Sequence, residues 1–170
     1  MTIQIGERVP GATLYESTEF GEACPLAPAK IDVAEATRGK RIVVFGLPGA
    51  YTPTCSAKHV PGYLEQLAAL KARKVDEVWC VAVNDGFVMA AWGRDQEAIG
   101  KIRMLGDGSA EWTRKLGLEA DLTGGGMGIR MRRFSMLLDD GVVKQLNLEA
   151  PGKFEVSDAD TLLRQAKELR

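Results

Sequence analysis

The sequence predicts an α/β fold with a mixed central β-sheet and helices on both faces of that sheet. Over residues 41–105, short apolar runs of strand length alternate with segments whose apolar residues recur at helical spacing. An Asp140-Gly141 pair between two later apolar runs is typical of a β-hairpin. An amphipathic helical pattern closes the chain over residues 157–169. Alternating strands and helices give parallel pairs and a hairpin adds antiparallel ones, so a mixed sheet is expected.

The N-terminal part of the chain predicts only short elements. Residues 9–15 and the region near Leu26 are typical of short strands around a turn that contains Gly, Glu and Pro. Residues 31–37 are expected to form a short helical segment with Asp32 near its start.

The clearest pattern is a strand followed by a helix. The apolar run over residues 41–45 predicts a buried strand. After a proline-containing loop, apolar residues at helical spacing predict a helix from about Cys55 to about residue 73. Pro61 lies inside this helix and is expected to kink it, because proline lacks an N–H group and crowds the preceding turn.

The rest of the chain continues the alternation. We expect a strand over 77–83, a helix capped by Asn84-Asp85 to about residue 97, a strand over 102–105, a helix over 110–116 ended by Gly117, strands over 129–139 and 142–148, and a helix opened by Ser157. The glycine-rich run over 124–128 is interpreted as a turn, because no predicted strand precedes it and no helix follows it. This order is the thioredoxin-like arrangement. No repeat or linker divides residues 1–170, so a single domain is expected.

Composition excludes several classes of function. The 170 residues include 22 basic and 23 acidic side chains, so no overall field attracts nucleic acid or an anionic membrane. No apolar run approaches the roughly 20 residues of a membrane span, and the N-terminus does not resemble a signal peptide. The three cysteines, Cys24, Cys55 and Cys80, lie far apart and do not form a disulfide framework. A cytoplasmic setting is therefore expected.

Cys55 is the candidate nucleophile. It begins a helix, where unpaired N–H groups and the positive end of the helix dipole favour a thiolate over a thiol. Thr52 is near enough in sequence to bring its hydroxyl beside the sulfur, and Pro48 and Pro53 stiffen the intervening loop. A thiolate, a hydroxyl and free N–H groups in one shallow pocket suit a small acceptor rich in oxygen. A buried structural cysteine, the alternative, fits this surrounding sequence less well.

This chemistry also needs a fixed cation, which would favour the thiolate and stabilise a departing oxygen. Candidates occur in the predicted strand over 129–139. Strand alternation puts Arg133 on one face and both Arg130 and Arg132 on the other. Both faces also carry apolar residues, so the pattern leaves open which face meets Cys55. A solvated face is the alternative for Arg130 and Arg132.

His59 is the single histidine and follows Cys55 by one helical turn. A zinc site would pair these two residues at i and i+4, but no further histidine and no cysteine at ligand spacing completes it. We therefore expect no metal. The sequence leaves two interpretations of His59 open, a pocket residue and a hydrogen-bonded histidine within a helix.

The run Pro48-Gly49-Ala50-Tyr51-Thr52-Pro53-Thr54-Cys55-Ser56 resembles the active-site motif of the peroxiredoxins, specifically their type-5 (plant type-II) subgroup in the alkyl hydroperoxide reductase/thiol-specific antioxidant family. Residues 83–88, 91–93 and 132–136 resemble further landmarks of that subgroup, in the same order. The resemblance spans essentially the whole chain.

The resemblance implies roles for individual residues. Cys55 would be the peroxidatic cysteine, and Arg133 would be the active-site arginine. Thr52 would hydrogen-bond the peroxide and the sulfur, and Pro48 would shield the sulfenate. Gly49 would complete the peroxide cradle with the Cys55 N–H, and His59 would lie near the pocket. Animal members carry a resolving cysteine where this chain has Ser157. Cys80 matches the second cysteine of plant-type members and is either a resolving cysteine or a small buried hydrophobic residue. Cys24 matches no landmark.

The function implied is a thiol-dependent peroxidase that reduces hydrogen peroxide and alkyl hydroperoxides, in antioxidant defence and redox homeostasis. Glutathione with glutaredoxin, or thioredoxin, would reduce oxidised Cys55, and no metal, haem or flavin cofactor is expected. The subgroup forms homodimers, with Phe87 and Trp92 either in the core or at that interface. An alternative is a peroxide-sensing redox relay or a holdase-type binding protein. A disulfide oxidoreductase is disfavoured, because Cys55 lacks a partner at C-x-x-C spacing.

Overall fold

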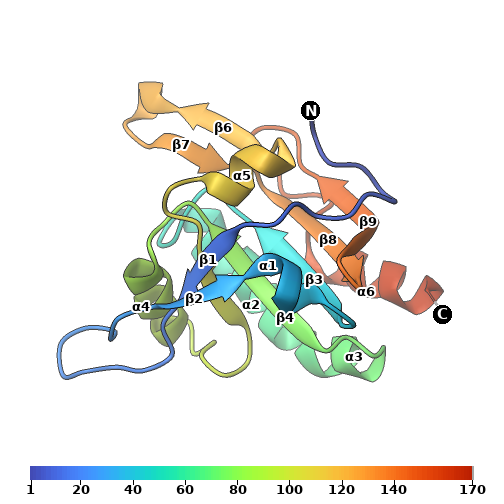
Figure 1. The fold of residues 1–170 in the computed structure, drawn as a ribbon, viewed down its shortest axis with the longest axis horizontal. Coiled ribbons are helices and arrows are strands. Elements are labelled where there is room, and N and C mark those ends of the chain that lie inside the picture. Colours follow the sequence, from blue (N-terminus) through green and yellow to red (C-terminus); the bar gives the residue numbers. More distant parts are fainter. Residues whose placement is uncertain (170) are drawn as a thin grey trace.

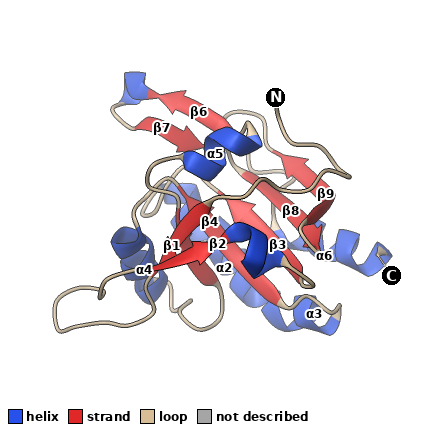
Figure 2. Ribbon diagram, viewed as in Figure 1, coloured by secondary structure: helices blue, strands red, loops and turns tan. Residues whose placement is uncertain are grey.

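The computed structural model, which describes residues 1–169, contains a seven-stranded mixed sheet at the centre of the fold (Figures 1 and 2). In spatial order its strands are β2 (Ala29–Asp32), β1 (Thr13–Glu16), β5 (Arg103–Gly106), β4 (Glu77–Ala82), β3 (Arg41–Gly46), β8 (Phe134–Asp139) and β9 (Val142–Leu148). Strands β3, β4 and β5 are parallel, and the strands added on either side are antiparallel. The predicted α/β class with a mixed sheet is confirmed.

Helices cover both faces of the sheet, as predicted. One face packs on α2 (Val60–Glu65), α3 (Leu67–Ala72), α4 (Gly86–Asp95) and α6 (Ala159–Glu168), and the other on α1 (Val33–Thr37) and α5 (Glu111–Leu116). In Figure 1, α1 and α5 lie in front of the sheet and α2 and α3 behind it. The central strand β3 serves both cores, with Phe45 on the first face and Val44 on the second, because successive strand side chains point to opposite faces.

The helix at Cys55 has the predicted extent but begins with a π-helical turn, η1 (Cys55–His59), before α2. The Val60 N–H donates to the Cys55 carbonyl, five residues earlier. Pro61 follows directly and has no N–H to donate, so the wider turn accommodates the proline that was expected to kink the helix. Such turns are frequent at functional sites. A second interruption at Gln66 separates α2 from α3.

Two predictions in the N-terminal part were wrong. The region near Leu26 is a loop with one isolated bridge between Phe20 and Pro25. The start of the predicted helix over 31–37 belongs instead to β2, which pairs with β1. The helix begins later, with Asp32 as its N-cap accepting a hydrogen bond from the Glu35 N–H. Pairing with β1 thus extends the chain where the local pattern favoured a helix.

The predicted strand over 129–139 is two strands. Its first part, β7 (Gly128–Met131), leaves the central sheet and pairs with β6 (Glu119–Leu122), an exposed strand that the sequence pattern did not indicate. The glycine-rich run is the turn between them, with the short helix η2 (Thr123–Gly125). It is a turn as expected, although a strand does precede it. Arg132 and Arg133 occupy the break before β8.

The hairpin and the last helix follow closely from the sequence. Asp140 and Gly141 have φ values of 50° and 77°, and two such positive values are what a tight hairpin turn of this type needs. Helix α6 begins one residue later than expected, because Asp158 is its N-cap and accepts from the Thr161 N–H. The hydroxyl of Ser157 donates instead to Glu149.

Candidate active site

Cys55 lies at the start of η1, directly after the loop that leaves β3, and its side chain is fully buried. A cation lies beside it: Arg133 Nη2 is 3.1 Å from the Cys55 Sγ. The sheet produces this contact. Strand β8 runs antiparallel to β3, so Phe134 at its start pairs with Gly46 at the end of β3. The residue before β8 therefore lies beside the loop that carries Cys55.

The break before β8 determines which arginine meets Cys55, a point that strand alternation left open. Within β8, Leu137 packs in the same core as Cys55, and Arg133 shares that side as the alternation predicted. Across the break the alternation fails, because Met131 packs in the opposite core. Arg133 is thus the arginine beside the sulfur, and neither Arg130 nor Arg132 contacts it.

His59 fixes the other end of the Arg133 guanidinium. Its Nδ1 lies 2.8 Å from Arg133 Nη1, and its Nε2 lies 3.1 Å from the Ser157 carbonyl oxygen. A guanidinium can only donate, so Nδ1 accepts and the ring proton sits on Nε2, which donates to the carbonyl. Burial, and then the charge of Arg133, lower the pKa of His59 from 6.5 to about 3. The imidazole is therefore neutral at physiological pH. It is 1% exposed, so it is a hydrogen-bonded buried histidine.

The loop before Cys55 is held by its own hydrogen bonds and by neighbouring segments. The Thr52 hydroxyl donates to the Gly49 carbonyl at 2.8 Å. The Ala50 N–H donates to the side-chain oxygen of Asn84 at 2.9 Å, which ties the loop to the end of β4. Tyr51 has φ of 63°, an uncommon value for a residue with a side chain, and its hydroxyl donates to Asp95 at 2.6 Å. The loop is therefore fixed at Thr52 and over the three residues that precede it.

Arg130 is a site residue whose role the sequence did not indicate. Its guanidinium donates to the carbonyls of Pro48 at 3.1 Å and Met127 at 2.9 Å. A Cβ added to Gly49 would lie 2.5 Å from Arg130 Nη1, so a larger residue here would displace the end of the Arg130 side chain. Arg130 therefore links the β6–β7 hairpin to the Cys55 loop, rather than lying on a solvated face.

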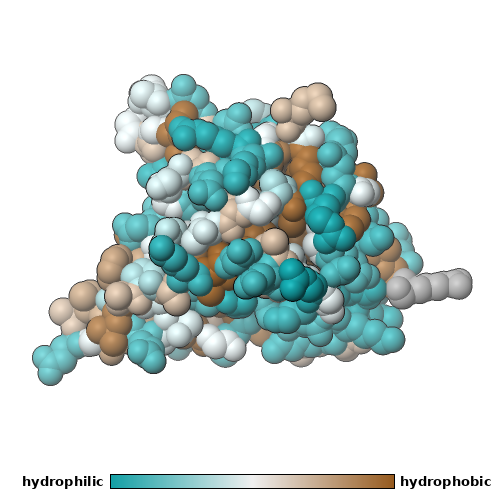
Figure 3. Space-filling view, viewed as in Figure 1, coloured by the Kyte–Doolittle hydropathy of each residue, from teal (hydrophilic) through white to brown (hydrophobic). Residues whose placement is uncertain are grey.

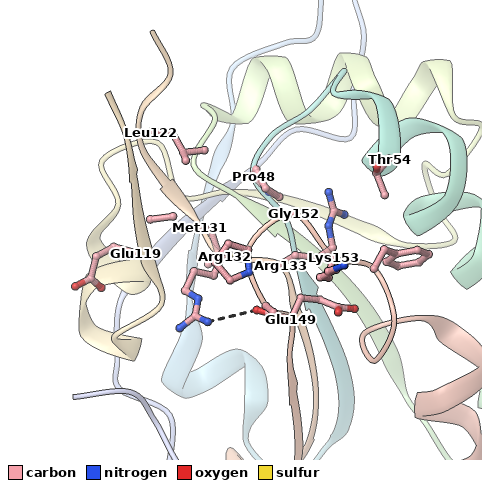
Figure 4. A pocket seen from close by; sticks show the side chains of 14 residues that line it. Pro48, Thr54, Glu119, Leu122, Met131, Arg132, Arg133, Glu149, Gly152 and Lys153 are labelled. Atoms are coloured by element: carbon pink, nitrogen blue, oxygen red, sulfur yellow. Dashed lines mark hydrogen bonds between the residues drawn. The ribbon is translucent and has the colours of Figure 1, made fainter. Parts of the chain in front are cut away.

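A cavity of about 550 Å³ opens beside the site (Figure 4). Its lining is mainly apolar, and it combines Pro48, Thr54, Glu119, Ala120, Leu122, Met131, Arg132, Arg133, Glu149, Ala150, Pro151, Gly152, Lys153 and Phe154. Figure 4 shows Pro48 and Arg133 on one side of this space, with Leu122 and Met131 of the β6–β7 hairpin on another. The cavity is therefore a route by which a small molecule can reach the Cys55 loop.

The other two cysteines lie in different surroundings. Cys80 is fully buried in β4, in the same core as Cys55, and burial raises the pKa of its thiol well above the ordinary value. It packs as a small hydrophobic residue in the reduced chain. Cys24 is exposed in the loop between β1 and β2. Of the two aromatic residues with open roles, Trp92 is buried and donates to Ser56, whereas Phe87 is 45% exposed.

Within residues 1–169, no group of three or more His, Cys, Asp or Glu side chains has an arrangement that could hold a metal ion. Among the helices in that range, none combines the length and apolar character needed to cross a membrane.

The fold and the site together define a thiol protein of the thioredoxin-like class, with a buried cysteine at a helix start beside a fixed arginine. The family model described as Redoxin matches residues 4–163. Peroxiredoxin-2B of Arabidopsis thaliana is 46% identical over 162 residues, which cover 95% of this chain and 97% of the relative. The chain therefore belongs to the Redoxin family and, within it, to the peroxiredoxins, as its sequence resemblance indicated. It is a thiol-dependent peroxidase.

Solved structures agree with this assignment. The reduced Prx3 of Vibrio vulnificus in complex with H2O2 is 45% identical, with a TM-score of 0.89, and the match covers 97% of this chain and 99% of that one. A Burkholderia cenocepacia structure, provisionally described as a thioredoxin reductase, is 55% identical with a TM-score of 0.91, covering 96% and 98% of the two chains. The present chain has no C-x-x-C pair for disulfide reduction.

Proposed function

We propose that this peroxidase reduces hydrogen peroxide and alkyl hydroperoxides at Cys55. The observation that carries the proposal is the 3.1 Å contact between Arg133 Nη2 and the Cys55 Sγ, which places the permanent positive charge of the guanidinium beside the sulfur. The relative from Vibrio vulnificus was solved in its reduced form with H2O2, which supports that substrate. The mainly apolar cavity beside Pro48 and Arg133 supports organic hydroperoxides as well.

In the proposed first step, the Cys55 thiolate attacks one peroxide oxygen. An S–O bond forms as the O–O bond breaks, and the departing oxygen takes a proton and leaves as water or an alcohol. Arg133 stabilises the thiolate and the negative charge that develops on the departing oxygen. Thr52 and the N–H groups around Gly49 and Cys55 orient the peroxide, and Pro48 limits access of water to the sulfenic acid.

Of the two interpretations left open for His59, a pocket residue that binds substrate and a hydrogen-bonded histidine, we favour the second and give it a positioning role. The ring is buried, and both nitrogens have protein partners, Arg133 and the Ser157 carbonyl. A neutral acceptor at Nδ1 orients Arg133 without adding a competing positive charge. We assign His59 to the support of the arginine.

In the second stage, an external thiol reduces the sulfenic acid. Its sulfur attacks the Cys55 sulfur, an S–S bond forms and water leaves; a second thiol then releases Cys55 and an external disulfide. Glutathione with glutaredoxin, or thioredoxin, is the proposed reductant, since Ser157 replaces the resolving cysteine of animal members and Cys80 is buried. The cycle assigns no step to a metal or organic cofactor. The proposed setting is the cytoplasm.

A homodimer is the proposed assembly. Leu26 is 47% exposed and Phe87 is 45% exposed, and the loop that carries Leu26 lies against α4, with Pro28 beside Gly86 and Phe20 under Arg94. Figure 3 shows hydrophobic side chains gathered over this loop and α4, at the lower left. Association through this surface would remove them from water. Phe87→Glu should convert the dimer to a monomer in light scattering, and an unchanged mass would reject this surface.

The test of the catalytic proposal is steady-state peroxide consumption with excess glutathione and glutaredoxin, or thioredoxin and its reductase. Cys55→Ser should abolish consumption, whereas Cys24→Ser, which removes only an exposed loop thiol, should retain it. Multiple turnovers distinguish a peroxidase from a peroxide-sensing relay or a holdase, which needs one oxidation for each signal. A Cys55→Ser variant with full activity would exclude the proposed site.

A further inference from the structure

The segment between β9 and α6 is held by a buried carboxylate. Glu149 is 3% exposed, and its two oxygens accept from the N–H groups of Glu155, Val156 and Ser157 at 2.8–3.0 Å. The Ser157 hydroxyl adds a fourth donor group at 2.7 Å. Burial alone would raise the pKa of Glu149, but these hydrogen bonds hold it below its usual value. Glu149 is therefore an anion whose acceptor sites face one short stretch of backbone.

That stretch contacts the active site through Ser157. The N–H and hydroxyl of Ser157 bind Glu149, while its carbonyl accepts from His59 Nε2 at 3.1 Å and from the Tyr63 hydroxyl at 2.9 Å. Glu149 thus determines where the carbonyl of Ser157 points. The carbonyl in turn holds the proton of His59 on Nε2, which leaves Nδ1 free to accept from Arg133.

Two further contacts join the same loop to the arginine. The Phe154 ring packs edge-on against His59 with centroids 5.0 Å apart, and the Arg133 guanidinium carbon lies 5.8 Å from the Phe154 centroid. The Glu149 N–H also donates to the Arg133 carbonyl at 3.0 Å. In Figure 4, Glu149, Lys153 and Arg133 lie on the same side of the cavity. The arginine is therefore surrounded by groups that Glu149 anchors.

We propose that Glu149 is a positioning residue of the peroxidase site, which acts through the Ser157 carbonyl and His59 to fix Arg133 against the Cys55 sulfur. This inference rests on the proposed catalytic function of Cys55 and Arg133. It assigns Glu149 no contact with the peroxide. The Glu149 carboxylate acts through the hydrogen-bonded chain from Ser157 to His59 to Arg133, whereas the hydrogen bond from the Glu149 N–H to the Arg133 carbonyl belongs to the backbone and does not depend on the carboxylate.

The test compares Glu149→Gln with the matched control Glu155→Gln, both in a Cys24→Ser background so that alkylation reports Cys55. Glu155 has an exposed side chain on the same loop, and its N–H remains available in the control, so both variants remove one negative charge locally. The measurement is the rate of Cys55 alkylation by iodoacetamide across pH, together with the rate of oxidation by H2O2 under single-turnover conditions.

Glu149→Gln should move the pH profile of Cys55 alkylation toward higher pH by about 0.5 to 1 unit. This is less than the shift of about 1–3 units that a full opposite charge beside a titrating group produces, because Arg133 is displaced and not removed. Oxidation at neutral pH should slow by about 3- to 10-fold, less than the roughly 10- to 100-fold cost of losing a hydrogen-bond partner of a metal ligand, because Glu149 is two hydrogen bonds further from the reacting atom. Glu155→Gln should match the parent in both measurements. Equal profiles for Glu149→Gln and Glu155→Gln would overturn the proposal.

A double-mutant cycle with His59→Leu separates positioning from simple loop stability. If Glu149 acts through His59, adding Glu149→Gln to His59→Leu should produce little further shift. Fully additive shifts would overturn the proposed route. Should Glu149→Gln fail to fold, Glu149→Asp keeps the charge but shortens the reach, and should give a smaller shift in the same direction; no shift would reject the proposal. Alkylation does not depend on peroxide turnover, so a parent enzyme that fails to consume peroxide would reject the catalytic proposal separately.

Discussion

His59 Nδ1 accepts a hydrogen bond from Arg133 Nη1 at 2.8 Å, and this contact makes the single histidine of the chain a neutral support for a cation. The ring cannot take up a proton without losing that acceptor and placing a second positive charge beside the guanidinium. Burial and Arg133 together lower its pKa to about 3. Histidine usually serves as a titrating group near neutral pH; here the surroundings remove that property.

The first prediction concerns stability against pH. The pKa of His59 falls from 6.5 to about 3 on folding, so the unfolded chain binds the proton more tightly. The stability that depends on neutral His59 is fully present above pH 6.5 and is lost as pH falls toward 3. Between about pH 7.5 and about pH 5, the free energy of unfolding should fall by about 2 kcal/mol. Urea unfolding at several pH values measures this.

The chain has one histidine, so this window isolates it from the carboxylates, which titrate lower. His59→Leu should have a lower free energy of unfolding than the parent enzyme at pH 7.5, but that free energy should change little across the same pH range. A flat curve for the parent enzyme would contradict the low pKa.

The second prediction concerns the positive charge of Arg133 beside the Cys55 sulfur. Arg133→Gln should slow the oxidation of Cys55 by about 100-fold, because it removes a preorganised donor that stabilises the negative charge developing on the departing oxygen. Arg133→Lys should recover part of this rate, because it keeps the charge but lacks the planar fork that binds sulfur and His59 together. Rapid-mixing fluorescence with H2O2 measures the rate. Arg38→Gln changes an exposed arginine directly after α1 and serves as the control. Equal rates for all variants would remove Arg133 from the mechanism.

The third prediction concerns the close packing of β3 against β8. A Cβ at Gly46 would overlap the Phe134 ring and the Met131 sulfur, next to the break that carries Arg133. Gly46→Ala should therefore lower the free energy of unfolding by about 1–3 kcal/mol, as overpacked cores do. Gly125→Ala, in the β6–β7 turn, meets no atom within 4 Å and should change stability little. If denaturant unfolding ranks the two variants equally, the packing at Gly46 is looser than described.

The fourth prediction concerns Cys80. Its thiol is fully buried and its pKa is raised, so it should not react with the Cys55 sulfenic acid before an external thiol does. Intact mass after one equivalent of peroxide should show a gain of one oxygen, and with glutathione present a glutathione adduct. Cys80→Ala should show the same mass gains relative to its own untreated mass. A loss of two hydrogens that Cys80→Ala abolishes would instead identify Cys80 as a resolving cysteine.

Much of the fold was predictable because it depends on local pattern. Apolar runs located β3, β4 and β5, Asp85 caps α4 as expected, and Asp140-Gly141 makes its hairpin. The errors occurred where a distant partner decides the conformation. Residues 31–32 are extended because they pair with β1, and β6 exists because β7 leaves the central sheet to pair with it. A short, exposed strand has too few apolar residues to produce a periodic signal.

The sequence by itself determined the nucleophile. Cys55 follows a buried strand and a proline-stiffened loop and begins a helix, and these are properties of one continuous segment. Neighbouring residues along the chain are sufficient to set such a geometry, which is why the candidate thiol and its loop could be named before any tertiary contact was known.

Only the tertiary structure decided what surrounds that thiol. Arg133 is beside Cys55 because β8 pairs with β3 and the chain breaks before β8. His59 contacts Arg133, and Ser157 and Glu149 support His59 from the segment between β9 and α6. Side-chain alternation defines two faces within a strand, but it carries no information across a break or between segments. Strand register and buried hydrogen bonds fix those relationships, and they depend on residues as far as 98 positions apart.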